Sequence, residues 1–222
     1  MILKVNMWLR KVVTFNNSYH NFEDLEIEKL FKRKTGTALW IALECKRPSK
    51  REVLVEKLKK YVPIDIAGNC GNISCWGYPY RCIDYNTTYK FYLAFENSLC
   101  QDYLTEKTFK VMDDYIIPVI YSGVELTRFL PPKSYIDVND FENVEALGKY
   151  LKFLSENVKE YKKYFWWKKY YKVVQKKFDL CDICKKLNEP NLHRKKQVYT
   201  RINEWFNKNV CSKPKIKFWS FF

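Results

Sequence analysis

The sequence predicts an α/β fold, a Rossmann-like parallel sheet with helices on both faces. Two observations lead to this fold class. Almost continuous apolar runs of strand length recur along the chain, as in strands that are buried on both faces of a sheet. Segments with apolar residues at helical spacing separate these runs, and strands that alternate with helices favour parallel pairing.

The composition agrees with a folded domain. Hydrophobic residues make up 47% and aromatic residues 18% of the 222 residues, which excludes a disordered chain. Lys and Arg number 40 against 25 Asp and Glu, and the resulting net charge of +15 favours phosphate in nucleic acid, anionic lipid or a nucleotide. No apolar run approaches the roughly 18 residues of a membrane span, and no signal peptide is visible.

The first half of the chain predicts a β-α-β unit. Residues 1–34 show no clean period, and we expect residues 1–36 to form an irregular leader in which 23–31 can form a short helix. The apolar run 38–43 predicts a buried strand. Ser49 is expected to cap a helix that ends before Pro63, and residues 64–67 predict the next strand.

The second half continues the alternation. Residues 68–88, with three Gly and three Cys, predict a surface loop. Further strands are predicted at 90–95, 116–121 and 134–138, and helices at 105–115, 143–155 and 157–171. From residue 172 the chain is basic and helical, and we expect this tail to pack across the sheet domain.

The polar segment after the strand 90–95 is the candidate site, because ligands of open parallel sheets bind at the carboxyl ends of strands. Its side chains suit a sugar nucleotide: hydrogen bonds from Asn97 and Ser98, a stacking face from Tyr103, an acceptor for sugar hydroxyls in Glu106, and a cation for phosphate near a helix N-terminus in Lys107. Alternatively, Thr105 and Glu106 only cap the helix, and Lys107 is a solvated charge.

Eight collinear strings carry a more specific signal. They are Ser49-Lys-Arg51, Tyr61-Val-Pro-Ile-Asp-Ile-Ala-Gly-Asn-Cys-Gly71, Phe95-Glu-Asn-Ser98, Asp102-Tyr-Leu-Thr-Glu-Lys107, Ile117-Pro-Val-Ile-Tyr-Ser-Gly123, Pro131-Pro-Lys-Ser-Tyr-Ile-Asp-Val138, Tyr164-Phe-Trp-Trp-Lys168 and Cys181-Asp-Ile-Cys184. Together they resemble the α1,3-fucosyltransferases, glycosyltransferase family 10, over residues 37–187.

The resemblance implies the C-terminal half of a GT-B glycosyltransferase. Residues 37–187 would bind GDP-fucose, after the poorly matched leader 1–36 and before a basic helical tail at 188–222. Such an enzyme transfers fucose with inversion from GDP-fucose to N-acetylglucosamine of a glycan. Carried over residue by residue, Arg51 contacts the diphosphate. Asn97, Tyr103, Glu106 and Lys107 contact the nucleotide and fucose, and Lys107 neutralises the departing phosphate.

The resemblance also implies parts that we expect this chain to lack. Family members are type II Golgi membrane proteins, and an N-terminal acceptor-binding domain supplies their general base, so the catalytic base is unknown here. Leu43-Glu44-Cys45 departs from the family's Ser-Asn pair before Cys. Glu44 places a negative charge near an anionic donor, and we expect weak or no binding of GDP-fucose and little transfer. No cofactor is expected to be required, and Mn²⁺ stays open because no Asp-x-Asp pair demands it.

The cysteines and sequons report on the compartment. Asn16, Asn72 and Asn86 are glycosylation acceptors if the chain enters the secretory pathway. The resemblance implies a short-range disulfide between Cys181 and Cys184, and a second one between Cys70 and either Cys75 or Cys82. Free thiols are the alternative in the cytosol. Zinc is not expected, because the Cys-x-x-Cys pair lacks a partner pair and the chain has two His.

A second class of function remains open beside the enzyme. The chain would then be an inactive truncated donor domain, or a basic module that holds nucleic acid or acidic glycans. The alternating aromatic and Lys residues of 161–172 suit single-strand binding. We favour an amphipathic helix with its aromatic rings inward, because no nucleic-acid motif accompanies the run.

Overall fold

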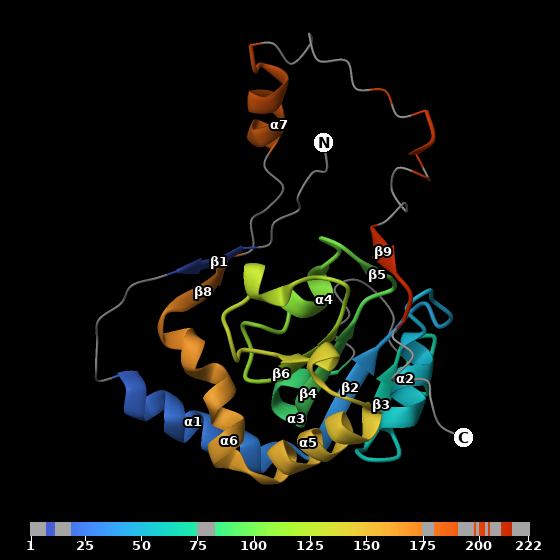
Figure 1. Cartoon of the computed structure of the whole chain (residues 1–222). Coiled ribbons are helices and arrows are strands. Elements are labelled where there is room, and N and C mark those ends of the chain that lie inside the picture. Colours follow the sequence, from blue (N-terminus) through green and yellow to red (C-terminus); the bar gives the residue numbers. More distant parts are fainter. Residues whose placement is uncertain are drawn as a thin grey trace.

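The protein is built on a five-stranded sheet in which every neighbouring pair is parallel (Figure 1). This computed structural model describes residues 8–11, 19–74, 83–174, 180–190, 198, 200–202, 204 and 210–214. The strands are β2 (Gly36–Ile41), β3 (Ile64–Ala67), β4 (Tyr89–Phe95), β6 (Ile117–Tyr121) and β7 (Ile136–Asp137), in the order β3-β2-β4-β6-β7. The α/β fold class and its parallel sheet are confirmed.

Helices cover both faces of this sheet, as predicted. One face packs against α1 (Tyr19–Arg33), α2 (Arg51–Leu58), α5 (Val144–Glu156) and α6 (Val158–Lys162), with Trp40, Phe91 and Leu147 among its core side chains. The other face packs against α4 (Glu106–Phe109) and the 3₁₀ helices η1 (Leu126–Arg128) and η3 (Lys163–Lys169), with Tyr92, Met112 and Trp167 in its core. The strands β4 and β6 read as continuous apolar runs because both of their faces are buried.

Several short strands and helices lie outside the central sheet and the helices that cover it. They are β1 (Trp8–Lys11) paired antiparallel with β8 (Tyr171–Val174), β5 (Leu99–Cys100) paired antiparallel with β9 (Cys211–Ser212), α3 (Tyr85–Thr88), η2 (Val138–Asp140) and α7 (Leu180–Leu187). The segment expected to be an irregular leader thus contains the 15-residue helix α1. In the tail, β9 lies beside β5, whereas α7 stands away from the sheet (Figure 1). None of the described helices combines the length and apolarity that crossing a bilayer requires.

Two local predictions are wrong for identifiable reasons. Ser49 does not cap α2: the N-cap is Lys50 in a left-handed conformation, and the buried Ser49 hydroxyl donates instead to the carbonyl of Glu96 at 2.7 Å. The helix predicted at 105–115 ends at Phe109, and tight turns follow. There the carbonyl of Met112 accepts from Lys168 Nζ at 2.8 Å, so a side chain takes the place of a helical partner.

The run of aromatic and Lys residues follows the amphipathic interpretation only in part. One helix is predicted over 157–171, but α6 ends at Lys162, η3 follows, and β8 begins at Tyr171; Tyr170 is exposed. Tyr161, Phe165 and Trp167 are buried, whereas Trp166 is 38% exposed. Of the neighbouring lysines, Lys162 pairs with Glu28 at 2.9 Å and is therefore engaged within the protein.

The cysteine pairing differs from the expectation. Cys70 is disulfide-bonded, but to Cys45 and not to Cys75 or Cys82, both of which lie outside the described residues. Because β2 and β3 are neighbouring parallel strands, the loops at their carboxyl ends bring Cys45 close to Cys70. A second disulfide joins Cys100 to Cys211 across a sequence separation of 111 residues. Cys181 and Cys184 lie exposed on α7 as thiols, so the bond expected between them is not formed.

Candidate functional site

The centre of the candidate site is Glu96, the residue that directly follows β4 and is 0% exposed. Its backbone N–H donates to the carbonyl of Tyr121 at the end of β6. Its carboxylate accepts from the backbone N–H and hydroxyl of Thr105, each at 2.8 Å, and from Lys107 Nζ at 3.0 Å. A buried carboxylate requires such partners, since an unpaired one is strongly destabilising. Glu96 therefore ties the start of α4 to the carboxyl edge of the sheet.

Lys107 is held by this network. Its ammonium group also donates to Thr105 Oγ1 at 2.7 Å, and its side chain is 20% exposed. Thr105 occupies the N-cap position of α4 but makes no side-chain cap hydrogen bond, because its hydroxyl donates to Glu96. Lys107 is thus a positioned cation at the sheet edge and not a solvated charge.

Arg51, the first residue of α2, joins the same edge from the neighbouring loop. Its guanidinium is buried and donates to the carbonyl of Phe95 at 2.7 Å and to that of Glu44 at 2.8 Å. Burial lowers the pKa of Arg51 from its usual value, and the nearby Glu96 and Glu44 oppose this shift. The side chain fixes the loop after β2 against the end of β4.

Asn97 is bound to the same loop after β2 through its amide and its backbone. The Asn97 Nδ2 donates to Glu44 Oε2 at 2.8 Å, and its backbone carbonyl accepts from the N–H of Ser49 at 3.1 Å. Arg47 forms an ion pair with the same Glu44 carboxylate oxygen. Three atoms here are buried without a partner among the described residues: Arg47 Nε, Arg51 Nε and Asn97 Oδ1. This edge therefore retains unused hydrogen-bonding capacity.

Tyr103 and Glu106 complete the set. Tyr103 is half-buried, and its pKa is raised first by burial and then by the carboxylates of Glu96 and Glu106. The side chain of Glu106 is 66% exposed and lies 3.9 Å from Lys107 Nζ. Asp102, which pairs with Arg128 at 3.3 Å, adopts a left-handed backbone conformation that Asp tolerates better than most residues. It turns the chain between β5 and Tyr103.

The five residues predicted from sequence thus lie on segments that meet at one edge. Arg51, Asn97 and Lys107 connect through Phe95, Glu44 and Glu96, and the charges that act on Tyr103 include those of Arg51 and Glu106. The sequence reasoning missed Glu96, Glu44 and Arg47 as parts of this network. A charged residue directly after the apolar run 91–95 is the signal that identifies Glu96.

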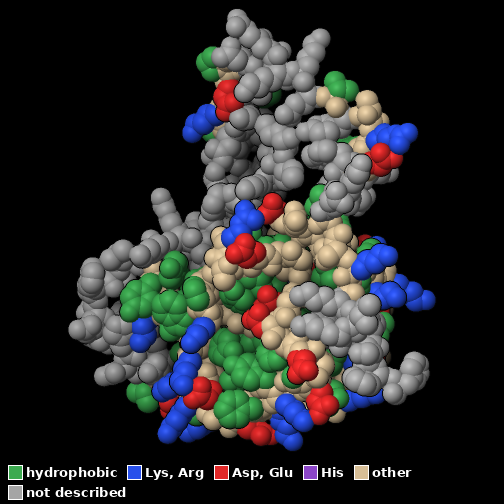
Figure 2. All heavy atoms as spheres, in the orientation of Figure 1, with side chains coloured by type: hydrophobic (Ala, Val, Ile, Leu, Met, Phe, Trp, Pro, Cys, Tyr) green, Lys and Arg blue, Asp and Glu red, His purple; other side chains and the backbone are tan. Residues whose placement is uncertain are grey.

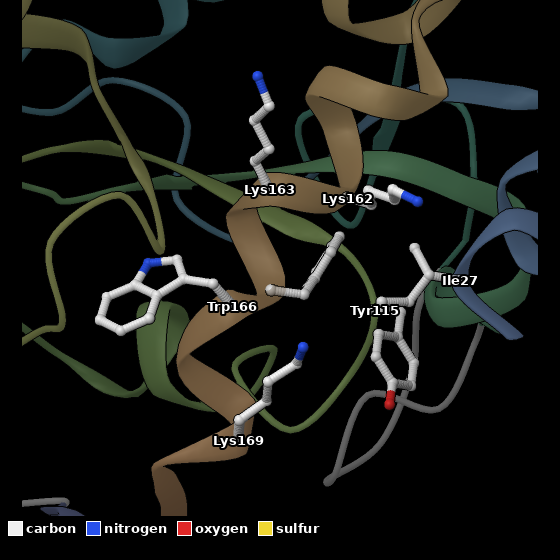
Figure 3. A pocket seen from close by; sticks show the side chains of 7 residues that line it. Ile27, Tyr115, Lys162, Lys163, Trp166 and Lys169 are labelled. Carbon is white, nitrogen blue, oxygen red and sulfur yellow. The ribbon is translucent and has the colours of Figure 1, made fainter. Parts of the chain in front are cut away.

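A cavity of about 180 Å³ lies elsewhere, at the amino edge of the sheet (Figure 3). Its lining combines Ile27, Tyr115, Lys162, Lys163, Phe165, Trp166 and Lys169. None of the predicted site residues lines it, so this cavity is separate from the candidate site.

The remaining predictions concern metal and glycans. The described part of the chain contains no cluster of three His, Cys, Asp or Glu that could hold a metal ion. Asn72 is exposed in the loop after β3, whereas Asn86 is half-buried and its Oδ1 accepts from the N–H of Tyr115 at 3.0 Å. Asn16 lies outside the described residues. Glycosylation of these residues stays a prediction.

Known proteins resemble this chain over most of its length. It is 40% identical over 200 residues to "Alpha-(1,3)-fucosyltransferase C" of Drosophila melanogaster, covering 90% of this chain and 45% of the relative. It is 37% identical over 168 residues to "Alpha-(1,3)-fucosyltransferase fut-1" of Caenorhabditis elegans, covering 70% of this chain and 39% of the relative. The chain therefore spans less than half the length of either relative.

Solved structures show the same fold. A crystal structure of an α1,3-fucosyltransferase with GDP superposes with a TM-score of 0.53 and 25% identity, covering 68% of this chain and 44% of that one. The family model for the C-terminal part of "Glycosyltransferase family 10 (fucosyltransferase)" matches residues 31–205, which include all five predicted site residues. The chain therefore belongs to glycosyltransferase family 10, the fucosyltransferases.

Proposed function

We propose that this chain is the donor-binding part of an inverting α1,3-fucosyltransferase that uses GDP-fucose and fucosylates N-acetylglucosamine of a glycan in the Golgi. The observation that carries the proposal is the Lys107 ammonium, held by buried Glu96 at the carboxyl edge of a parallel sheet. Ligands of such sheets bind at this edge, and a relative's structure contains GDP.

The proposed chemistry on this side of the reaction is electrostatic. When the bond from fucose to GDP breaks, negative charge develops on the departing diphosphate, and a fixed cation stabilises this charge without reorganising. Glu96 and Thr105 orient Lys107 for that purpose through hydrogen bonds of 3.0 and 2.7 Å. The exposed Glu106 accepts hydrogen bonds from fucose or ribose hydroxyls, and Tyr103 offers a face for stacking.

The transfer also needs a general base on the acceptor hydroxyl. We assign this role to no residue of this chain and propose that an acceptor-binding domain, as in the complete enzymes of the family, supplies it. No bound metal takes part in the proposal, and Mn²⁺ dependence is tested by adding EDTA to the binding assay. Unchanged GDP binding in EDTA is the expected result.

The alternative of a nucleic-acid-binding module is less well supported. Lys and Arg side chains are interspersed with Asp and Glu on the face shown in Figure 2 and do not form one continuous basic surface there. Within residues 161–172, Lys163 pairs with Glu160 at 2.7 Å and Lys168 donates to the carbonyls of Met112 and Asp113. These contacts engage two of the lysines of the run.

The test is calorimetric titration of GDP into the chain produced with its disulfides formed, with UDP as the comparison nucleotide. We expect weak but GDP-selective binding, because Glu44 places a carboxylate near the diphosphate. Lys107→Ala should abolish that binding, whereas Lys149→Ala, which removes an exposed lysine of α5, should leave it unchanged.

Lys107→Ala also leaves the buried Glu96 without its cation, so a second variant is needed. Tyr103→Ala leaves the Glu96 network intact and should weaken GDP binding at an unchanged melting temperature. Absence of GDP binding by the folded chain, or equal binding of UDP, would contradict the proposed function.

A further inference from the structure

We propose that Arg47 is a further diphosphate-binding side chain and that Glu44 controls its availability as an internal competitor for the donor's phosphates. The proposal rests on the proposed function and deepens it. It adds two residues of the loop between β2 and α2 to the donor site.

The geometry places one carboxylate oxygen between two hydrogen-bond donors. Glu44 Oε2 accepts from Asn97 Nδ2 at 2.8 Å and forms the ion pair with Arg47. Asn97 belongs to the predicted donor site, so a phosphate that approaches Asn97 meets the oxygen of Glu44 and the guanidinium of Arg47 in the same place. Phosphate and carboxylate oxygens bind the same face of a guanidinium, which makes the two anions direct competitors.

The ion pair is accessible enough to be exchanged. The side chain of Arg47 is 34% exposed and that of Glu44 is 50% exposed, and exposed ion pairs contribute little to stability. A diphosphate carries more negative charge than one carboxylate and should displace Glu44 from Arg47. The Nε of Arg47 is buried without a partner among the described residues, so the guanidinium has a further donor to offer.

The backbone around Glu44 is fixed, which limits the exchange to side chains. The carbonyl of Glu44 accepts from Arg51, and the carbonyl of Leu43 accepts from Asn69 Nδ2 at 3.1 Å. Cys45 is joined to Cys70 by a disulfide. Because the backbone is held on both sides of Glu44, its carboxylate can rotate away while Arg47 stays at the sheet edge.

The experiment compares charge-matched variants of the 222-residue chain. Glu44→Gln removes the negative charge but keeps an oxygen that can accept from Asn97, and Glu56→Gln makes the same charge change in an exposed pair of α2. Arg47→Ala is matched by Lys59→Ala, which removes the cation of that exposed pair. GDP and guanosine are titrated into each variant, since guanosine lacks the diphosphate.

We expect Glu44→Gln to tighten GDP binding about three- to tenfold relative to Glu56→Gln, from the loss of one like charge close to the diphosphate. Arg47→Ala should weaken GDP binding by a similar factor relative to Lys59→Ala. The gain from Glu44→Gln should be smaller in the double variant, because the part of it that comes from freeing Arg47 is then lost. Guanosine binding should not change in any variant, because guanosine lacks the diphosphate. A structural disturbance of the site would instead change the affinity for both ligands.

The outcomes separate the inference from the proposed function. If the chain binds GDP selectively but Glu44→Gln binds it no more tightly than Glu56→Gln, the role of Glu44 and Arg47 is overturned and the proposed function stands. The same holds if Arg47→Ala retains full affinity. If neither the unaltered chain nor Glu44→Gln binds GDP while both melt cooperatively, the proposed function fails and the inference fails with it.

Discussion

The two edges of the central sheet use similar side chains in different ways. At the amino edge, Lys34 Nζ donates to the carbonyls of Tyr89 and Tyr115, each at 2.7 Å, and the Tyr161 hydroxyl contacts the carbonyls of Lys90 and Tyr115. At the carboxyl edge, Arg51 likewise donates to two carbonyls, but the adjoining Arg47, Asn97 and Glu52 each keep a buried atom without a partner among the described residues.

We interpret this difference as that between a structural edge and the proposed binding edge. Buried polar atoms are normally hydrogen-bonded, so a concentration of unsatisfied ones indicates a place where water or a ligand supplies the missing partners. The Lys34 side chain at the amino edge is already hydrogen-bonded to two backbone carbonyls, so its role is structural. We therefore expect changes at the amino edge to affect stability alone, and changes at the carboxyl edge to affect stability and nucleotide binding together.

The largest effect should come from Glu96→Ala at the carboxyl edge. Removing one partner of a buried ion pair costs about 3–5 kcal/mol, because Lys107 is left without its counter-charge and Thr105 loses its acceptor. Urea denaturation measures this loss, and GDP titration of the folded fraction should show no binding. Glu56→Ala, in an exposed pair, should cost less than about 1 kcal/mol. Equal losses of unfolding free energy in the two variants would contradict the central role that we assign to Glu96.

A pH-dependent effect should come from Lys34 at the amino edge. Burial lowers the pKa of Lys34 to about 7, while Asp114 and Asp84 oppose the shift. The unfolded chain keeps this amine protonated up to about pH 10, so between these values it binds more protons than the folded chain. Stability should therefore rise with pH from about 7 to 10, by about 2–4 kcal/mol.

The matched variant for that rise is Lys34→Met, which cannot titrate. Urea denaturation of both proteins at several pH values gives the difference curve, and only the unaltered chain should gain stability from Lys34 over this range. A parallel rise in Lys34→Met would assign the pH dependence to other groups. GDP binding by Lys34→Met should equal that of the unaltered chain, because Lys34 lies at the opposite edge from Lys107.

The smallest effect should come from Tyr161→Phe. The ring of Tyr161 is fully buried and its hydroxyl lies 2.9 Å from the carbonyl of Lys90 and 3.1 Å from that of Tyr115. Removing the hydroxyl keeps the packing and leaves the two carbonyls short of a donor, at a cost of about 1–2 kcal/mol. A shift in the urea midpoint with an unchanged GDP affinity is expected, and weakened GDP binding would show that the two edges are coupled.

Much of the fold could be predicted because local patterns determine it. The apolar runs placed β4 and β6 to within a residue, since strands buried on both faces tolerate few polar residues. The end of α4 could not be predicted, because Lys168, from a distant part of the chain, bonds the carbonyl of Met112. The pairing of Cys70 with Cys45 likewise depends on which strands become neighbours.

The site was predictable in its residue types but not in its connections. The family strings include Asn97, Tyr103, Glu106 and Lys107, yet the sequence does not show that Glu96 is the buried acceptor that orients Lys107. The cap predicted at Ser49 is wrong because a serine hydroxyl can either cap a helix or bond a distant segment, and the sequence alone does not show which it does. The ion pair between Glu44 and Arg47, and the bond from Asn97 to the same carboxylate oxygen, can be seen only once the loop after β2 is folded against Asn97.

The bond between Cys100 and Cys211 has a consequence for the order of events during synthesis. A ribosome that adds about 5–20 residues per second completes Cys211 several seconds after Cys100. All five strands of the sheet are made before Cys211. The disulfide that fixes Cys100 is thus absent until residue 211 has been synthesised. A nascent chain can therefore complete its sheet before Cys100 has the thiol of Cys211 with which to form a disulfide.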